Sequence, residues 1–115
     1  LTSGVVERTV DNPRWLPPEV LEASAPYSLA SDMYSFGLVL WELYARELPF
    51  EEFSYRFDAR LEEAIMGGLR PSMPLHAPEP VCSLIKALLH TDPAKRPKAH
   101  ETLEKLSEAR SLAPP

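Results

Sequence analysis

The chain has 115 residues, of which 44% are apolar and 25% charged, and its formal net charge is −5. This length allows one modest hydrophobic core, and the composition is that of an ordinary globular protein, not of a disordered or fibrous one. The basic residues are dispersed among acidic ones, which argues against a nucleic-acid partner, because phosphate binding needs a concentrated basic surface. The longest apolar run is far too short for a membrane segment, and no signal-peptide pattern is seen, so we expect an intracellular, cytoplasmic protein.

Cysteine and histidine usage argues against disulfides and metals. The one cysteine, Cys82, cannot form an internal disulfide, and we expect it to be a small buried apolar residue. The histidines His76, His90 and His100 are too widely spaced for a zinc-type cluster, so no metal site is predicted. Because the first residue is Leu1 and not methionine, we expect the chain to be part of a longer protein.

The first half of the chain predicts a loop followed by a strongly apolar helix. Residues 1–18 contain several prolines and no sustained hydrophobic period, which indicates an irregular loop that ends in an extended stretch. A short helical turn is expected at 18–21, since proline is tolerated in the first turn of a helix. The next helix is predicted at 29–45, capped by Ser28 or Ser31, and apolar residues surround it on nearly every side. Such a helix is normally the buried centre of an all-helical domain.

Three later segments are amphipathic and can cover this central helix. The first has its apolar face at Phe57, Leu61, Ala64 and Ile65 and ends at two glycines. The second follows two prolines, with apolar residues at Val81, Leu84, Ile85, Leu88 and Leu89. The third, from about 98 to 109, is marked by Leu103 and Leu106. We therefore predict a mainly α fold, with one buried central helix surrounded by amphipathic helices and a C-terminal tail or linker at 109–115.

Five motifs follow one another along the chain. They are Asn12-Pro13-Arg14-Trp15-Leu16-Pro17-Pro18-Glu19, Ser31-Asp32-Met33-Tyr34-Ser35-Phe36-Gly37, Glu47-Leu48-Pro49-Phe50, Gly68-Leu69-Arg70-Pro71 and Leu88-Leu89-His90-Thr91-Asp92-Pro93-Ala94-Lys95-Arg96-Pro97. Their order and spacing resemble the large, C-terminal lobe of the eukaryotic protein kinases. The first motif resembles the end of the activation segment, where the family usually has Ala-Pro-Glu. The residues of these motifs are most similar to those of the tyrosine-kinase-like group of serine/threonine kinases.

Two literal matches to kinase motifs have a different interpretation. The sequence Ala77-Pro78-Glu79 lacks matching surroundings, and we expect it to start the next helix. Ser35-Phe36-Gly37 is similar to the metal-binding Asp-Phe-Gly motif, but it falls inside the central helix pattern. No metal is assigned to it.

The resemblance implies structural roles for three charged residues of a helical lobe that spans 19–108. Glu19 would pair with Arg96 in a buried ion pair between the two ends of the lobe. Asp32 would anchor the catalytic loop, although a carboxylate at the start of a helix is also favourable as a plain cap.

The resemblance also assigns residues 1–18 to the end of the activation segment and the substrate-groove loop. The shelf of that groove would be formed by Pro13, Arg14, Trp15 and Leu16, with simple packing on the lobe as the alternative for Trp15. Activation-loop phosphorylation sites would be Thr2, Ser3 and Thr9. Asn12 stands where many serine/threonine kinases carry a threonine, which leaves the choice between serine/threonine and tyrosine open.

The implied activity belongs to a complete parent protein. That parent would be a protein kinase that phosphorylates protein serine or threonine, or tyrosine, with ATP and magnesium as cofactors. The chain contains neither a Gly-x-Gly-x-x-Gly nor a His-Arg-Asp motif, so no catalytic residue and no bound cofactor are expected in it. Its partners would be the protein substrate and the missing N-terminal part of the kinase domain, without which part of the central helix should be exposed. The alternative is a pseudokinase or scaffold module that binds proteins without phosphotransfer.

Overall fold

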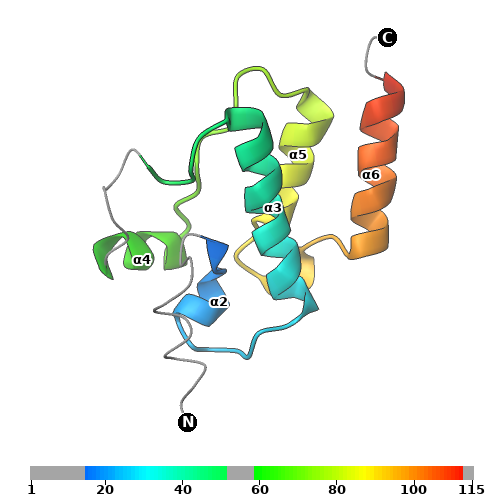
Figure 1. The fold of residues 1–115 in the computed structure, drawn as a ribbon. Helices are drawn as coiled ribbons and strands as arrows, with labels where there is room; N and C mark the ends of the chain where they lie inside the picture. The colour runs from blue at the N-terminus through cyan, green and yellow to red at the C-terminus, as the bar shows by residue number, and fades with distance from the viewer. Residues whose placement is uncertain (1–14, 52–58, 113–115) are drawn as a thin grey trace.

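The computed structural model describes residues 15–51 and 59–112, excluding the side chains of residues 111 and 112, and within these ranges every regular element is a helix (Figure 1). The elements are α2 (Pro18–Leu21), α3 (Leu29–Ala45), α4 (Ala59–Met66), α5 (Glu79–Leu88), the short 3₁₀ helix η2 (Pro93–Lys95) and α6 (Ala99–Leu112). The predicted mainly α fold is confirmed. The predicted bounds of α2 and α3 agree with the structure.

Helix α3 is delimited by local hydrogen bonds. At its start the Ser28 hydroxyl accepts a hydrogen bond from the Ser31 amide, and the Ser31 hydroxyl accepts one from the Ser28 amide. This reciprocal capping box satisfies amides that have no partner within the helix. At its end Arg46 adopts a left-handed conformation, with φ of 60°, and donates its amide to the Glu42 carbonyl. Both predicted caps, Ser28 and Ser31, therefore act together.

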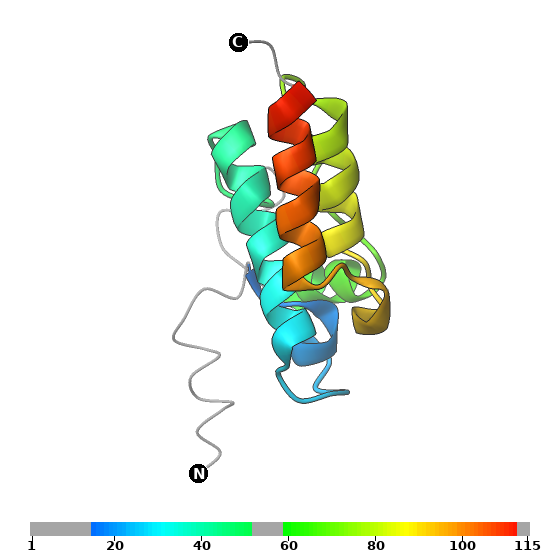
Figure 2. The same cartoon turned by 90° about the vertical axis from the view of Figure 1, so that its right-hand side faces the viewer.

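The described helices pack in two connected groups. Figures 1 and 2 show α3 and α5 side by side, with α6 against α5 and α2 close to α4. The larger core lies between α3 and α5 and consists of Tyr34, Leu38, Leu40, Trp41, Val81, Leu84, Ile85, Leu88 and Leu89. A smaller core between α2 and α4 consists of Leu21, Phe50, Leu61 and Ile65.

One side of α3 is not covered by the described residues. Asp32, Phe36, Val39 and Leu43 follow one another at helical spacing and are all exposed, and we call them the open face of α3. The side chains of Phe36, Val39 and Leu43 are 38%, 43% and 69% exposed. The predicted exposure of part of the central helix is thus confirmed.

Helix α5 matches its predicted pattern, because all five of its expected apolar residues are buried. Pro78 is its N-cap and Glu79 its first residue, so the sequence Ala77-Pro78-Glu79 starts this helix as expected. Cys82 is buried, as predicted, and its Sγ lies 3.7 Å from the Ala77 carbonyl.

Two predicted helix faces need correction. In α4, Ala64 is exposed, because this short helix buries only Leu61 and Ile65, one turn apart. In α6, Leu103 is 68% exposed, whereas Thr102 is buried.

Leu103 is exposed because α6 turns a different set of residues toward α5 than the sequence pattern predicted. The side facing α5 carries Thr102, Leu106 and Ala109, at helical spacing, so Leu103 points away. The helix also continues to Leu112, past its predicted end at 109, so residues 109–112 of the predicted tail are helical. The predicted apolar residue Phe57 lies outside the described ranges.

No helix in the described ranges combines the length and apolar character that crossing a membrane requires.

Close packing of α3 on α5 predicts a cost for a methyl group at Gly37. A Cβ there would lie 2.8 Å from Leu88 Cβ and 3.0 Å from Leu89 Cδ2. Overpacking costs about 1–3 kcal/mol, which outweighs the gain of about 1 kcal/mol in helix propensity. We expect Gly37→Ala to lower the free energy of unfolding, measured by urea denaturation of the full chain.

The matched control is Gly67→Ala, since a Cβ at Gly67 would meet nothing closer than 3.5 Å. Its free energy of unfolding should stay the same or rise slightly. Equal effects of the two substitutions would contradict the packing proposed for α3 and α5.

Candidate functional site

The segment that precedes α2 is held by contacts from two directions. The Trp15 side chain packs against the core between α3 and α5, and Leu16 packs against the core between α2 and α4. The Ser35 hydroxyl on α3 donates a hydrogen bond of 2.6 Å to the Trp15 carbonyl. Pro17 and Pro18 are buried and lead directly into α2. Trp15 and Leu16 are therefore fixed at the junction of the two cores.

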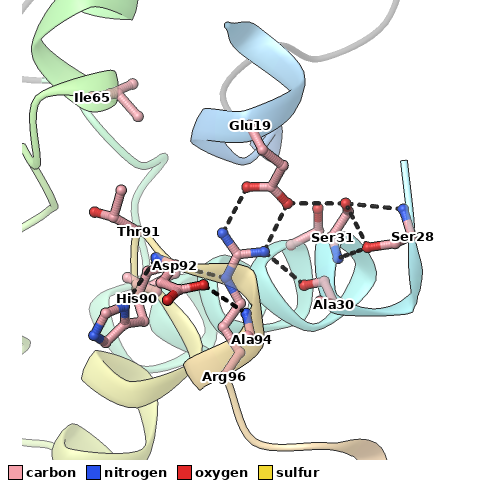
Figure 3. A network of polar contacts seen from close by, with 12 residues as sticks. Glu19, Ser28, Ala30, Ser31, Ile65, His90, Thr91, Asp92, Ala94 and Arg96 are labelled. Atoms are coloured by element: carbon pink, nitrogen blue, oxygen red, sulfur yellow. Dashed lines mark hydrogen bonds and ion pairs between the residues drawn. The ribbon is translucent and has the colours of Figure 1, made fainter. Parts of the chain in front are cut away.

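Glu19, in the first turn of α2, forms a two-pronged ion pair with Arg96 (Figure 3). The distances are 2.8 Å from Arg96 Nη2 to Glu19 Oε1 and 2.9 Å from Nη1 to Oε2. The Arg96 side chain is fully buried and the Glu19 side chain is 6% exposed. The predicted partners are thus in direct contact, although 77 positions separate them in the sequence.

The remaining polar atoms of the pair also have partners. Ser31, which is fully buried, donates its hydroxyl to Glu19 Oε2 at 3.0 Å. Arg96 donates from Nη1 to the Ala30 carbonyl and from Nε to the His90 carbonyl. Figure 3 shows these contacts converging from α2, from the start of α3 and from the loop before η2. A buried ion pair is favourable only when its other donors and acceptors are satisfied in this way.

The environment of Glu19 favours its charged form. Burial alone would raise the pKa of this carboxyl. Hydrogen bonds from Arg96, from the Glu19 backbone and from Ser31, together with the positive charge of Arg96, outweigh burial and hold the pKa below its usual value of 4.5.

A second guanidinium lies beside the pair without a carboxylate partner among the described residues. Arg70 donates hydrogen bonds to the carbonyls of Ile65 and Leu69, at the end of α4, and to the carbonyl of Leu89, at the end of α5. It also donates to the Thr91 hydroxyl at 3.0 Å. A cation is favourable at a helix C-terminus, where carbonyl groups lack partners within the helix. Arg70 therefore joins the ends of α4 and α5.

The ring of Tyr34 contacts both guanidinium groups. Its ring centroid is 5.0 Å from the Arg96 guanidinium carbon and 5.3 Å from that of Arg70, which are cation–π distances. Its hydroxyl is buried and has no hydrogen-bond partner in the described part of the chain. Burial raises the pKa of Tyr34 to about 12, although the two positive charges act in the opposite direction.

Asp32 lies in the first turn of α3, where a negative charge is favoured by the helix dipole. Ser28, not Asp32, is the N-cap. The carboxylate is exposed on the open face of α3 and accepts a hydrogen bond from the Tyr27 hydroxyl. Burial, together with this hydrogen bond, raises the pKa of Tyr27. An exposed Asp32 is accessible to a further segment, and its anchoring role stays a prediction.

The other predicted site residues are divided between described and undescribed parts of the chain. Trp15 and Leu16, which are predicted for the groove shelf, are neighbours in the chain and pack on different cores. The remaining shelf and phosphorylation-site residues, Thr2, Ser3, Thr9, Pro13 and Arg14, lie outside the described ranges. Sequence reasoning missed Ser35 and Arg70 as site residues, because each donates mainly to backbone carbonyls, which leave no signature in a sequence.

The side chains that commonly bind metal ions do not cluster in the described part of the chain. The described residues contain no group of three or more His, Cys, Asp and Glu side chains that could hold a metal ion. Ser35-Phe36-Gly37 lies within α3, as expected, with Gly37 packed against α5.

The fold and the buried anchor define the C-terminal lobe of a kinase-type domain, and comparison with known sequences agrees. Residues 4–106 match the family described as "Protein tyrosine and serine/threonine kinase". The chain belongs to this family, as a part of its domain. The predicted resemblance to tyrosine-kinase-like serine/threonine kinases is confirmed.

Three relatives show the range of the similarity. The probable serine/threonine-protein kinase roco8 of Dictyostelium discoideum is 45% identical over 101 residues, which cover 88% of this chain and 5% of that protein. The serine/threonine-protein kinase STY46 of Arabidopsis thaliana is 34% identical over 109 residues, covering 92% and 18%. The scaffold protein ILK of Mus musculus is 40% identical over 88 residues, covering 75% and 19%. The chain thus spans only a small part of these relatives.

The low pKa of Glu19 predicts a specific acid dependence. A carboxyl whose pKa is lower in the folded state stabilises the fold above its unfolded value of 4.5, and this contribution is lost as the pH falls through the folded value. We expect the difference in unfolding free energy between wild type and Glu19→Gln to be largest at neutral pH and to shrink below about pH 4.5. Urea denaturation at several pH values measures it.

The control is Glu108→Gln, which removes an exposed ion pair of 3.9 Å with Lys105. Its unfolding free energy at neutral pH should stay within about 0.5 kcal/mol of wild type. A wild-type advantage over Glu19→Gln that is constant down to pH 3 would contradict the environment assigned to Glu19.

Proposed function

We propose that this chain is the C-terminal portion of a protein kinase domain whose complete parent transfers phosphate from ATP to serine or threonine of proteins, with tyrosine as the second acceptor class. In that domain the chain supplies the peptide-substrate groove and the anchor of the activation segment. Catalysis and nucleotide binding fall to the N-terminal part. The family membership and the similarity to two relatives named as serine/threonine-protein kinases support this assignment.

The open face of α3 is the observation that carries the proposal. A water-soluble domain rarely leaves a continuous apolar stripe exposed along its central helix. Phe36, Val39 and Leu43 form such a stripe, and Asp32 adds a carboxylate at its N-terminal end. Val39 and Leu43 also line a shallow hollow of about 520 Å³, together with Glu42, Arg46, Glu47 and Leu48. We infer that the N-terminal part of the domain covers this face and that its catalytic loop binds Asp32.

The substrate groove rests on a second part of the structure. Trp15 and Leu16 are held at the junction of the two cores. Glu19, four residues after Trp15, is held by its ion pair with Arg96. A backbone fixed in this way suits a preformed binding site, because little conformational entropy is lost when a peptide binds. We assign Pro13 and Arg14 to the same shelf from the sequence motif.

A non-catalytic scaffold is the second candidate. It is favoured by the name of one relative, the scaffold protein ILK, and by Pro17, which stands where the family usually has alanine. The two candidates differ upstream of this chain. His-Arg-Asp and Asp-Phe-Gly motifs in the parent favour the kinase, and a complete upstream domain without them favours the scaffold.

The coverage of α3 is tested by two leucine substitutions in the complete parent domain. Leu43 on the open face and Leu103 on α6 are 69% and 68% exposed here. We expect Leu43→Asp to lower the unfolding free energy of the complete domain by about 3 kcal/mol or more, because it buries an unpaired charge. Leu103→Asp should change it by less than about 0.5 kcal/mol. Equal effects would show that α3 stays uncovered in the parent.

Activity is measured on the same wild-type domain. Transfer of labelled phosphate from ATP to serine- or threonine-containing peptides is the expected result. A folded domain in which Leu43→Asp is destabilising but no phosphate is transferred would support the scaffold instead.

A further inference from the structure

Ser35 makes a contact that a helical serine does not usually make. Inside a helix, a serine hydroxyl commonly bonds to a carbonyl of the preceding turn or to water. The Ser35 hydroxyl instead donates to the Trp15 carbonyl, 20 residues earlier in the sequence, at 2.6 Å. Ser35 is half-buried. The hydroxyl therefore connects the central helix to the segment before α2.

This contact completes the restraint of Trp15. The Trp15 ring packs on the core between α3 and α5, and the next side chain, Leu16, packs on the other core. These apolar contacts act on the two side chains and not on the peptide group between them. The hydrogen bond from Ser35 fixes the carbonyl of that group.

We propose that Ser35 is a positioning residue of the substrate groove, which sets the backbone of Trp15 and thereby the selection of the peptide residue that follows the phosphoacceptor. The inference rests on the proposed function, in which Trp15 belongs to the groove shelf. Ser35 does not touch substrate itself. It acts through the Trp15 carbonyl.

The position of Ser35 on α3 supports this role. Ser31 and Asp32 occupy the preceding turn, and Ser31 donates to Glu19 Oε2 at 3.0 Å. Two serines one turn apart thus hold the segment before α2 and its first turn, at Trp15 and at Glu19. Glu19 is also held by Arg96, whereas among the described residues the Trp15 carbonyl accepts its hydrogen bond from Ser35. Removing the Ser35 hydroxyl should loosen the shelf while leaving the anchor in place.

The test is steady-state kinetics of the complete kinase domain with Ser35→Ala, Ser35→Thr and Ser83→Ala. Ser83 is the matched control, because its hydroxyl makes one hydrogen bond of 2.7 Å, to Glu79, on the exposed side of α5. We expect Ser35→Ala to raise the peptide KM about two- to tenfold, the loss that corresponds to one hydrogen bond. The kcat and the KM for ATP should change less than about twofold.

Peptides that vary at the residue after the phosphoacceptor provide a second measurement, the discrimination among them. A purely structural role of Ser35 would not change this discrimination. Ser35→Ala should reduce discrimination at that residue, while Ser35→Thr, which keeps the hydroxyl, should restore both discrimination and KM. An unchanged peptide KM in Ser35→Ala, or an equal rise in Ser83→Ala, would overturn the inference while leaving the proposed function intact. Absence of peptide phosphorylation by the wild-type domain would overturn both.

Discussion

The ion pair between Glu19 and Arg96 determines how the ends of this lobe meet. Taking two charges out of water is costly, so a buried pair is maintained only where nearly every donor and acceptor has a partner. Here the carboxylate receives both prongs of the guanidinium and the Ser31 hydroxyl, and the guanidinium also reaches two carbonyls. Removing any one group of this network leaves its buried partners without a hydrogen bond. Helix α2, the start of α3 and the loop before η2 therefore behave as one unit.

Arg70 extends the same principle to α4 and α5. It places a positive charge at the ends of two helices and donates hydrogen bonds to carbonyls there. The Tyr34 ring contacts both guanidinium groups, and this cation–π attraction offsets some of the repulsion between the like charges. The two apolar cores are thus joined by a polar layer. That layer is built from one carboxylate, two guanidinium groups and an aromatic ring.

Sequence reasoning predicted the elements whose signals are local. Helix α3 was predictable at both ends, because Ser28 and Ser31 form a capping box and the apolar run stops at Ala45. The partners Glu19 and Arg96 came from resemblance to a family, since nothing local links two residues so far apart. Exposure of Leu103 and burial of Thr102 were not predictable, because the sequence does not show where α5 crosses α6. The hydrogen bond of Ser35 and most of those of Arg70 end on backbone carbonyls, which every residue has.

A double-mutant cycle on Glu19 and Arg96 in the complete kinase domain tests the central claim most directly. Urea unfolding of Glu19→Met, Arg96→Met and the double variant would be measured. Each single substitution leaves a buried charge without its partner and should cost about 3–5 kcal/mol. The double variant leaves neither charge and should cost no more than the more harmful single one. Additive costs would show that the two residues stabilise the lobe independently, and would contradict the account.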